Sequence, residues 1–449
     1  MDKPVNNGSR LSWAERLKNS IAAKTAKVCV IGLGYVGLPL AVENAKAGFR
    51  VLGIDQNKSR VEMVNLGLNY IQDVDDQELM GLVKHGRLKA VDNFQGISEQ
   101  DILIICVPTP LNQHREPDTS YIRSVTAEIS KRLRPGQMII LESTTYPGTT
   151  EELILPMLES TGLKVGLDFF LAYSPERVDP GNKKYTTKNT SKVVGGVKPV
   201  CLSIAQCFYA ETITHVVPVS STTVAEMTKI FENTYRAVNI ALVNELMMLC
   251  DKMNINVWEV VEAAATKPFG IQTFYPGPGV GGHCIPIDPF YLNWKARQYD
   301  FQSRFVELAG EINIQVSSYV VGKVVQALND KGKAVKGSRV LVLGVAYKKD
   351  VGDCRESPAL RIMKQLKEKG AEVVFFDPYI KEITGKGREL EVEWVELTEE
   401  ELVKSDCVVI ITDHSNVDYE MVVAGARVLV DTRNATKHVK KGREKIILI

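Results

Sequence analysis

The sequence contains no Cys-x-x-Cys pair, and its eight cysteines and six histidines are scattered along 449 residues. Several cysteines, such as Cys29, Cys106 and Cys407, lie inside apolar segments. Paired cysteines and clustered histidines are the usual ligands of a structural zinc, and regularly spaced cysteines are typical of disulfide-rich secreted domains. Their absence predicts buried, reduced thiols in a cytoplasmic protein and no metal site.

Excess charge and long apolar runs are also missing. The 55 Lys and Arg residues balance 54 Asp and Glu residues, so a polyanionic partner such as nucleic acid is not expected. No apolar run approaches the roughly 20 residues that a membrane-spanning helix needs. The segment from Trp13 to Lys18 is amphipathic and lacks the apolar core of a signal peptide. We therefore expect a cytoplasmic protein that binds neither membranes nor nucleic acid.

The first 220 residues alternate between strand-like and helix-like segments. Residues 27–31, 51–55, 101–107 and 138–141 are apolar, and a helix between the first two of these strands runs to Ala47. Nearly continuous apolar strands separated by helices are typical of a parallel sheet that is covered on both faces.

Two long helices are expected beyond this region. Residues 223–253 contain neither glycine nor proline and show a helical spacing of apolar side chains. Such a helix is roughly 45 Å long, and helices of this length in soluble enzymes link domains or form subunit interfaces. Residues 303–330 again have the pattern of a helix, after a loop rich in glycine and proline at 276–289.

A second α/β segment begins near Ser338, and Ser357 followed by Pro358 predicts a helix N-terminus within it. Its expected strands are residues 339–344, 372–377, 406–411 and 428–431. The chain is therefore predicted to be an α/β protein with two doubly wound Rossmann-like domains, joined by a long central helix and a small helical domain. The predicted domain bounds are 1–220, 221–330 and 331–449.

A dinucleotide-binding motif follows the first predicted strand. Gly32, Gly34 and Gly37 form a G-x-G-x-x-G pattern that opens a helix, and Asp55 ends the next strand. The first glycine permits a tight turn, the second lets backbone approach a pyrophosphate, and the third allows close helix packing. An acidic residue at the position of Asp55 binds ribose hydroxyls and repels a 2′-phosphate. The motif predicts NAD binding in preference to NADP.

Hydroxyl side chains follow two further strands of the first domain. Pro108 and Thr109 come after one strand, and Ser143 and Thr144 come after another. Ligands of parallel α/β sheets bind outside the carboxyl ends of the strands. These hydroxyls therefore either contact the nicotinamide end of a dinucleotide and position a water molecule, or serve as ordinary turn and cap residues.

The long helix carries a lysine and an asparagine on one face. Lys229 and Asn233 are four residues apart among apolar neighbours. A partly desolvated lysine can stabilise developing negative charge. The alternative is a lysine whose stem packs on apolar surface while its ammonium reaches water.

One cysteine lies in a loop that is too rich in glycine and proline to form a helix or strand. Cys284 follows Gly281, Gly282 and His283, and Asp288 comes four residues later. Such loops fix the backbone at functional sites, although a free cysteine is often an inert part of a core. The loop favours a nucleophile and an inert thiol about equally.

The turn after the first strand of the C-terminal domain keeps only one glycine of a dinucleotide motif. It carries Lys348, and Arg355 follows nearby. A cationic turn of this kind either holds phosphates without an intact NAD motif or is a charged surface loop.

Six short segments, taken together, are specific. They are Gly-Leu-Gly-Tyr-Val-Gly-Leu-Pro at 32–39, Cys-Val-Pro-Thr-Pro at 106–110, Ser-Pro-Glu-Arg at 174–177, Lys-Ile-Phe-Glu-Asn at 229–233, Gly-Gly-His-Cys-Ile-Pro-Ile-Asp-Pro at 281–289 and Tyr-Lys-Lys-Asp at 347–350. With them the chain resembles the UDP-glucose/GDP-mannose dehydrogenase family over nearly its whole length. The segments at 268–278 and 290–292 most resemble the branch that oxidises UDP-N-acetylglucosamine.

The resemblance implies an NAD-binding domain, a helical dimerisation domain and a nucleotide-sugar domain, assembled as a homodimer through the central helix. It implies oxidation of the C6 alcohol of a UDP-sugar to a uronic acid for surface polysaccharides. In that reaction Cys284 would form a thiohemiacetal and then a thioester. Lys229 and Asn233 would stabilise the oxyanions, and Glu176, Thr144 and Asp288 would position the hydrolytic water.

Further binding residues are implied by the same resemblance. For the cofactor they are Gly32, Gly34, Tyr35, Val36, Gly37, Asp55, Pro108, Thr109, Ser143 and Thr144. For the substrate they are Glu176, Arg177, Lys229, Asn233, Tyr275, Gly281, Lys348 and Arg355.

Alternatives remain at this point. Within the family the substrate could be UDP-glucose, UDP-N-acetylmannosamine or UDP-N-acetylgalactosamine. Outside it, a 3-hydroxyacid dehydrogenase shares the fold and a helix-borne lysine and asparagine but needs no cysteine, and a nucleotide-binding regulator would need only the Rossmann domain.

Overall fold

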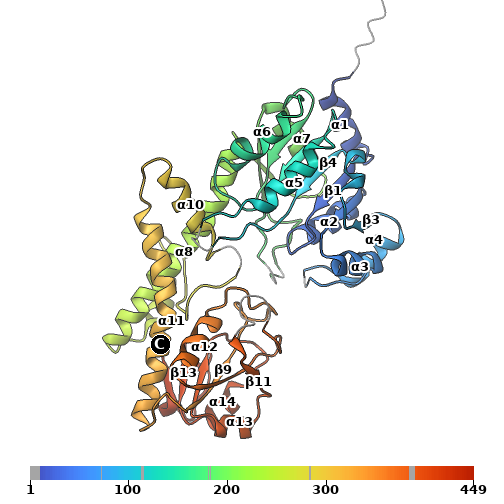
Figure 1. The fold of residues 1–449 in the computed structure, drawn as a ribbon. Helices are drawn as coiled ribbons and strands as arrows, with labels where there is room; N and C mark the ends of the chain where they lie inside the picture. Colours follow the sequence, from blue (N-terminus) through green and yellow to red (C-terminus); the bar gives the residue numbers. More distant parts are fainter. Residues whose placement is uncertain are drawn as a thin grey trace, which may run out of the picture. The chain divides into compact units, whose positions relative to one another are not determined.

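The structure is a computed structural model that divides into two compact units, Met1–Phe231 and Glu232–Ile449 (Figure 1). It describes residues 11–71, 73–112, 116–179, 182, 184–282, 285–383 and 390–449.

The first unit is built on an eight-stranded sheet. Its strands are β1 (Lys27–Ile31), β2 (Arg50–Ile54), β3 (Leu88–Val91), β4 (Ile102–Ile105), β5 (Met138–Leu141), β6 (Phe170–Tyr173), β7 (Lys192–Gly196) and β8 (Val216–Val219). The order is β3-β2-β1-β4-β5-β6-β7-β8. The first six strands are parallel and have the order of a doubly wound dinucleotide-binding domain. The residues of β4, β5 and β6 are buried throughout, as their continuous apolar sequences predict.

One strand beyond the predicted ones has the opposite direction: β7 runs antiparallel to β6. No helix lies between β6 and β7 in the part of the chain that the structure describes. A parallel connection needs a crossover, usually a helix, whereas a chain that returns directly pairs antiparallel. As a result, the start of β7 lies beside the carboxyl end of β6.

Helices cover both faces of this sheet (Figure 1). Leu17 of α1, Leu40 of α2 and Phe208 of α7 belong to the core on one face. Ile122 of α5 and Leu158 of α6 belong to the core on the other. The helices of this unit before α8 are α1 (Trp13–Ala22), α2 (Gly37–Lys46), α3 (Lys58–Leu66), α4 (Asp76–Lys84), α5 (Ser120–Ser130), a π-helical turn (Thr150–Ile154) that leads into α6 (Leu155–Glu159), and α7 (Pro199–Tyr209), with a 3₁₀ turn at Gln95–Glu99.

The predicted long helix is α8 (Thr222–Lys252), which runs unbroken because no residue in it interrupts the backbone hydrogen bonds. Its second half belongs to the second unit, where it packs on α11 (Arg304–Asp330) through residues such as Ala241 and Ala309. Asn244 of α8 also donates a hydrogen bond to the side chain of Asn313 of α11 (3.1 Å). Two shorter helices, α9 (Val257–Ala265) and α10 (Asp288–Arg297), lie between them in sequence.

The second sheet is parallel and repeats the doubly wound strand order. The order is β11-β10-β9-β12-β13-β14. Its strands are β9 (Arg339–Leu343), β10 (Glu372–Phe376), β11 (Glu393–Trp394), β12 (Cys407–Ile410), β13 (Leu429–Asp431) and β14 (Ile446–Leu448). The C-terminal half of α11 and α12 (Pro358–Glu368) cover one face. The helices α13 (Glu399–Lys404) and α14 (Tyr419–Gly425) cover the other, and a 3₁₀ turn at Arg443–Lys445 precedes β14.

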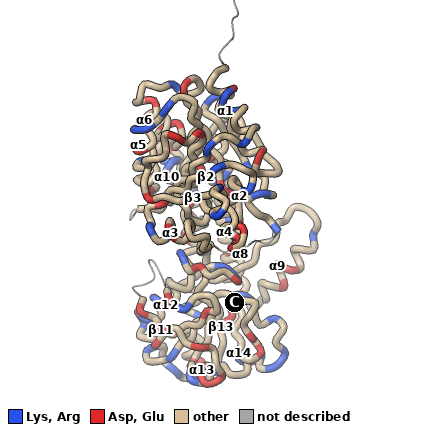
Figure 2. Tube along the Cα trace, turned by 90° about the vertical axis from the view of Figure 1, so that its right-hand side faces the viewer, with Lys and Arg blue, Asp and Glu red and all other residues tan. Residues whose placement is uncertain are grey.

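The predicted fold class is confirmed: two doubly wound Rossmann-like sheets, with long helices between them in sequence. Lys and Arg residues are interspersed with Asp and Glu residues in both units (Figure 2). None of the helices in the described ranges combines the length and apolar character required to cross a membrane. The described cysteines are all free, and Cys29, Cys106 and Cys407 are buried as expected.

Candidate active site

The glycine-rich loop lies between the carboxyl ends of β1 and β4, where the strand order reverses. Gly32 has φ 95°, and a Cβ there would lie 2.4 Å from the Cys106 carbonyl oxygen. A Cβ on Gly37 would lie 1.7 Å from the Gly32 carbonyl oxygen, so neither position tolerates a side chain. A Cβ on Gly34 would meet no atom within 4 Å. The open space at Gly34 leaves the loop backbone approachable by a pyrophosphate.

Asp55 lies beside this loop and helps to fix it. Its carboxylate accepts hydrogen bonds from the backbone N–H groups of Leu33 (2.9 Å) and Asn57 (2.8 Å). The hydroxyl of Tyr70 donates to the carbonyl of Leu33 (2.7 Å). These contacts leave further carboxylate lone pairs for ribose hydroxyls, so the site fits a dinucleotide. Tyr35 is exposed and Val36 is half-buried, both at the entrance to α2.

The hydroxyls at the ends of β4 and β5 bond the two strand ends to each other. Thr109 Oγ1 donates to the carbonyl of Thr144 (2.6 Å), and Ser143 Oγ donates to the carbonyl of Val107 (2.8 Å). Both hydroxyl protons are thus used within the turns. Pro108 is exposed and the side chain of Thr144 is half-buried. Any contact of Thr109 or Ser143 with a ligand must use the hydroxyl oxygen as an acceptor.

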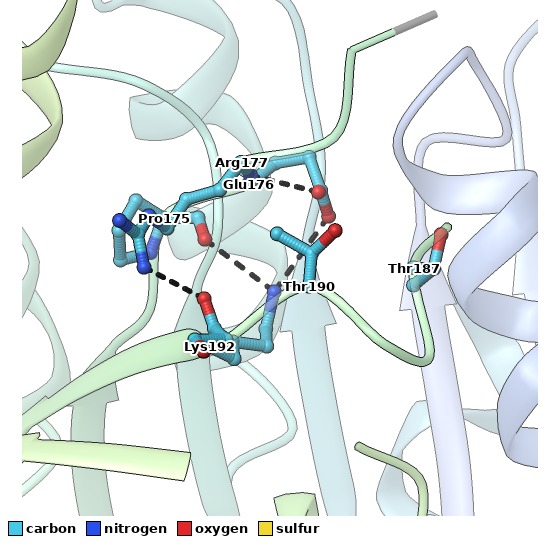
Figure 3. Close-up of a pocket in the computed structure, with 7 residues that line it drawn as sticks. Pro175, Glu176, Arg177, Thr187, Thr190 and Lys192 are labelled. Atoms are coloured by element: carbon cyan, nitrogen blue, oxygen red, sulfur yellow. Dashed lines mark hydrogen bonds and ion pairs between the residues drawn. The ribbon is translucent and has the colours of Figure 1, made fainter. Parts of the chain in front are cut away.

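Glu176 follows the carboxyl end of β6 and lines a small cavity of about 10 Å³ (Figure 3). Its Oε1 accepts hydrogen bonds from the backbone N–H groups of Arg177 and Val178, both at 2.8 Å. Its Oε2 lies 3.6 Å from the ammonium of Lys192. The guanidinium of Arg177 donates to the carbonyl of Ser191 (2.7 Å) and lines the same cavity. Glu176 is therefore held in one orientation by both of its oxygens.

Lys229 on α8 is only 8% exposed. None of the described residues pairs with its ammonium by a hydrogen bond or ion pair. Both alternatives for this lysine therefore stay open: a group that stabilises negative charge, or a stem packed on apolar surface with its ammonium reaching water. Asn233 is one turn further along the same helix face and is also buried.

Glu226, which the sequence did not single out, lies one turn before Lys229. Its carboxylate accepts hydrogen bonds from the backbone N–H groups of Gly148 (2.5 Å) and Thr150 (2.9 Å) and from the Thr150 hydroxyl (2.6 Å). These bonds tie the start of α8 to the turn that follows Thr144. Burial, partly offset by these hydrogen bonds, raises the pKa of Glu226 to about 7.

Replacing Glu226 with glutamine should change how stability depends on pH. The pKa of Glu226 is about 7 in the folded protein against an ordinary 4.5. Between pH 4.5 and 7, Glu226 is therefore protonated in the folded protein and ionised in the unfolded chain. Raising the pH through this window therefore destabilises the wild type, by roughly 3 kcal/mol in all, and glutamine removes this dependence. The measurement is the free energy of unfolding of each protein from urea unfolding. The wild-type value minus the Glu226→Gln value should fall by about that amount between pH 4.5 and 7.5.

The matched control is Glu62→Gln, because Glu62 is exposed on α3. Its difference from wild type should not vary with pH. Parallel pH curves for wild type and Glu226→Gln would show that Glu226 does not titrate in this range.

Hydrogen bonds anchor both sides of the glycine-rich segment that precedes Cys284 in the second unit. Asn244 accepts from the backbone N–H of Gly277 (3.0 Å), and Ser317 donates to the carbonyl of Pro278 (2.9 Å). The N–H of Gly282 donates to the carbonyl of Arg355 (3.1 Å). A Cβ on Gly281 would lie 2.7 Å from Cβ of Tyr347, so this segment packs closely on the C-terminal domain.

Asp288, four residues after Cys284 in sequence, begins α10 and is buried. The side-chain amide of Asn233 donates to its Oδ2 at 2.5 Å. The structure thus brings together two of the predicted catalytic residues. His283 and Cys284 lie outside the described residues.

The cationic turn after β9 has an acidic residue in the same place as the glycine-rich loop of the first unit. Asp377 corresponds to Asp55 of the first unit. It accepts a hydrogen bond from the N–H of Val345 (2.7 Å), just as Asp55 accepts one from the N–H of Leu33. It also accepts from Ala346 (2.9 Å) and lies 3.1 Å from Nε2 of buried His414. Asp377 is thus bonded both to its own turn and to a buried histidine.

The predicted substrate residues of the second unit have different surroundings. The guanidinium of Arg355 donates two hydrogen bonds to Oδ2 of Asp353, from Nε at 2.9 Å and from Nη2 at 2.6 Å. In this structure it is therefore paired with a carboxylate. Lys348 is half-buried. Tyr275 is exposed and stacks on Trp258 at 6.0 Å between ring centroids.

Arg433 is a further candidate that the sequence reasoning missed. It follows β13, and its Nε donates to the carbonyl of Ile411 (2.9 Å). A Cβ on Gly277 would lie 2.5 Å from its Nη1, so the guanidinium adjoins the anchored loop. Burial lowers the pKa of Arg433, with Asp413 and Asp431 partly offsetting it. The available signal was the place of an arginine just after a buried strand.

Comparison with known proteins agrees with this geometry. The chain matches the models of the UDP-glucose/GDP-mannose dehydrogenase family for the NAD binding domain at residues 26–213, the central domain at 223–315 and the UDP binding domain at 341–438. A UDP-N-acetyl-D-glucosamine 6-dehydrogenase of Pseudomonas aeruginosa is 38% identical over 361 residues, which cover 80% of this chain and 84% of the relative.

Solved structures are similar over almost the whole chain. UDP-D-ManNAc dehydrogenase from Pyrococcus horikoshii has a TM-score of 0.85 and 33% identity, covering 94% of this chain and 98% of the other. NDP-N-acetyl-D-galactosaminuronic acid dehydrogenase from Methanosarcina mazei Go1 has a TM-score of 0.81 and 30% identity, covering 98% of each. The predicted family, the NAD cofactor and the oxidoreductase activity are confirmed: the chain belongs to the UDP-glucose/GDP-mannose dehydrogenase family.

Proposed function

We propose that this enzyme oxidises the C6 hydroxymethyl group of UDP-N-acetylglucosamine to the carboxylate of UDP-N-acetylglucosaminuronate. The observation that carries the proposal is that hydrogen bonds fix the chain both before and after Cys284 in sequence. Residues 277–282 are bonded before it, and Asp288 is bonded to Asn233 after it. The acetylated sugar is chosen because the Pseudomonas aeruginosa relative has this activity in its name.

The overall reaction balances as R–CH2OH + H2O + 2 NAD⁺ → R–COO⁻ + 2 NADH + 3 H⁺. NAD, held by the glycine-rich loop and Asp55, supplies the hydride acceptor for both oxidations. Cys284 thiolate adds to the C6 aldehyde to give a thiohemiacetal, which the second oxidation converts to a thioester. Water then breaks the C–S bond, which releases the carboxylate and returns the thiol.

The chain's own residues stabilise charge and position water. Lys229 and Asn233 face the alkoxide and the later oxyanions, where a buried cation and an amide donor favour negative charge. Glu176, Thr144 and Asp288 position the hydrolytic water, and Glu176 takes its proton. The fixed orientation of Glu176 and the unpaired ammonium of Lys229 support these roles.

The proposal also assigns residues to the sugar and to the nucleotide. Arg177 and Tyr275 contact the sugar, and the backbone at Gly281 lies against it. Lys348 and Arg433 bind the UDP group, since cationic side chains match phosphate. Arg355 stays assigned to the same group, although its guanidinium contacts Asp353 in this structure. We assign these parts to domains at 1–220, 221–330 and 331–449.

The enzyme is proposed to act as a cytoplasmic homodimer that makes uronic acids for surface polysaccharides. Large apolar side chains remain exposed along the paired helices α8 and α11, and exposed apolar stripes of this kind mark interfaces. They include Leu242 (63% exposed), Leu249 (52%), Met253 (57%), Phe305 (80%) and Leu308 (53%).

UDP-N-acetylmannosamine is the second candidate substrate, because the similar Pyrococcus horikoshii structure is of a UDP-D-ManNAc dehydrogenase. A panel of UDP-glucose and the UDP derivatives of N-acetylglucosamine, N-acetylmannosamine and N-acetylgalactosamine separates these possibilities. We expect kcat/KM from initial NADH formation to be at least about 10-fold higher for UDP-N-acetylglucosamine, since one misplaced polar group costs roughly 1–3 kcal/mol. A higher value for an epimer would reassign the substrate.

A further inference from the structure

Three charged side chains meet at the carboxyl ends of β5 and β6, and the sequence alone assigns a role to only one of them. Glu142 follows β5 and is 1% exposed, and Lys192 begins β7 and is 4% exposed. Because β7 returns antiparallel to β6, Lys192 lies next to the segment that carries Glu176. Its ammonium lies 2.9 Å from Glu142 Oε2. The same ammonium lies 3.6 Å from Glu176 Oε2 (Figure 3).

Glu142 holds the lysine in place from the buried side. Its other carboxylate oxygen accepts a short hydrogen bond from the hydroxyl of Tyr209, which is also fully buried. Burial acts to lower the pKa of Lys192, but the carboxylates of Glu142 and Glu176 outweigh it and raise that pKa. Lys192 is therefore a cation at neutral pH, fixed by Glu142 and directed at Glu176.

Glu176 differs from Glu142 because it lines the cavity. Its Oε1 is used by two backbone N–H groups, so Oε2 is the oxygen that Lys192 controls. Thr190 lines the same cavity, and its hydroxyl oxygen is buried with no hydrogen-bond partner in the described chain. The cavity volume of about 10 Å³ is at the size that admits one water molecule.

We propose that Lys192 is a positioning residue for Glu176: anchored by Glu142, it keeps Oε2 of the Glu176 carboxylate directed at water in the cavity. This assignment rests on the proposed function, in which Glu176 takes the proton of the water that hydrolyses the thioester. The lysine touches neither substrate nor cofactor in this account. Its loss should therefore slow hydrolysis and leave the two hydride transfers nearly unchanged.

The test is rapid mixing of full-length Lys192→Met with NAD and UDP-N-acetylglucosamine. We expect a burst of two NADH per active site at close to the wild-type rate, followed by turnover that is roughly 100-fold slower, as for loss of general-base assistance. Intact-protein mass should show the acyl-enzyme during slow turnover. Lys192→Arg, which keeps the cation, should restore most of the turnover.

A second variant separates positioning from structural support. Lys192→Met leaves Glu142 buried without its cation, which by itself destabilises the fold. The double variant Glu142→Gln with Lys192→Met removes both charges and should recover thermal stability, but its hydrolysis should stay slow. Recovery of wild-type turnover in the double variant would overturn the assignment, as would a single variant with no burst and no acyl-enzyme. A wild type that forms no acyl-enzyme would overturn the proposed function itself, and the assignment with it.

Discussion

Replacing Cys284 with serine should lower uronate formation by at least about 1000-fold. A serine hydroxyl is almost entirely protonated at neutral pH and is a much weaker nucleophile than a thiolate, so the aldehyde is not trapped and the second oxidation has no covalent substrate. The measurement is chromatographic detection of the UDP-sugar acid after incubation with NAD, alongside the total NADH formed.

The matched control is Cys207→Ser, because Cys207 is a free, half-buried cysteine on α7. It should keep wild-type activity. Undiminished uronate formation by Cys284→Ser would contradict covalent catalysis and favour a simple alcohol dehydrogenase of the hydroxyacid type. A nucleotide-binding regulator would form no NADH in either protein.

Replacing Lys229 with methionine should lower kcat by roughly 100- to 1000-fold, the usual effect of removing one group that stabilises an oxyanion. The substitution should also leave the protein as stable as the wild type or more stable. The reason is that Lys229 is only 8% exposed, and methionine fills a similar space without a charge to desolvate. Steady-state kinetics and thermal unfolding measure the two effects separately.

Lys252→Met is the control, since Lys252 is an exposed lysine at the end of the same helix. It should change neither kcat nor stability appreciably. A Lys229→Met enzyme that is inactive and strongly destabilised would point to a structural role. One that retains full kcat would remove Lys229 from the catalytic site.

Local sequence signals predicted most of the fold. The long helix was expected at 223–253 and occurs at Thr222–Lys252, because the segment lacks glycine and proline and its apolar residues have a helical spacing. The strand at 138–141 was predicted to the residue, since a continuous apolar run has few alternatives. The antiparallel return at β7 was missed because strand direction depends on the connecting chain and not on the strand's own composition.

The candidate site was predictable where the residues that determine a backbone conformation all lie within one short motif. Gly32 is required by its own positive φ of 95° and Gly37 by its approach to the Gly32 carbonyl, both within the motif's turn, so the motif predicted the loop correctly. Glu226 and Lys192 were missed because their partners are distant in sequence: Glu226 bonds to Gly148, and Lys192 pairs with Glu142. No local pattern distinguishes such buried acids and lysines from surface residues.

The central claim is that one enzyme carries a single sugar through two hydride transfers by way of Cys284. The most direct measurement is the amount of NADH formed per UDP-sugar consumed, with the purified enzyme, limiting sugar and excess NAD. The account predicts two NADH per sugar, with no free aldehyde. One NADH per sugar, with aldehyde as the product, would contradict it.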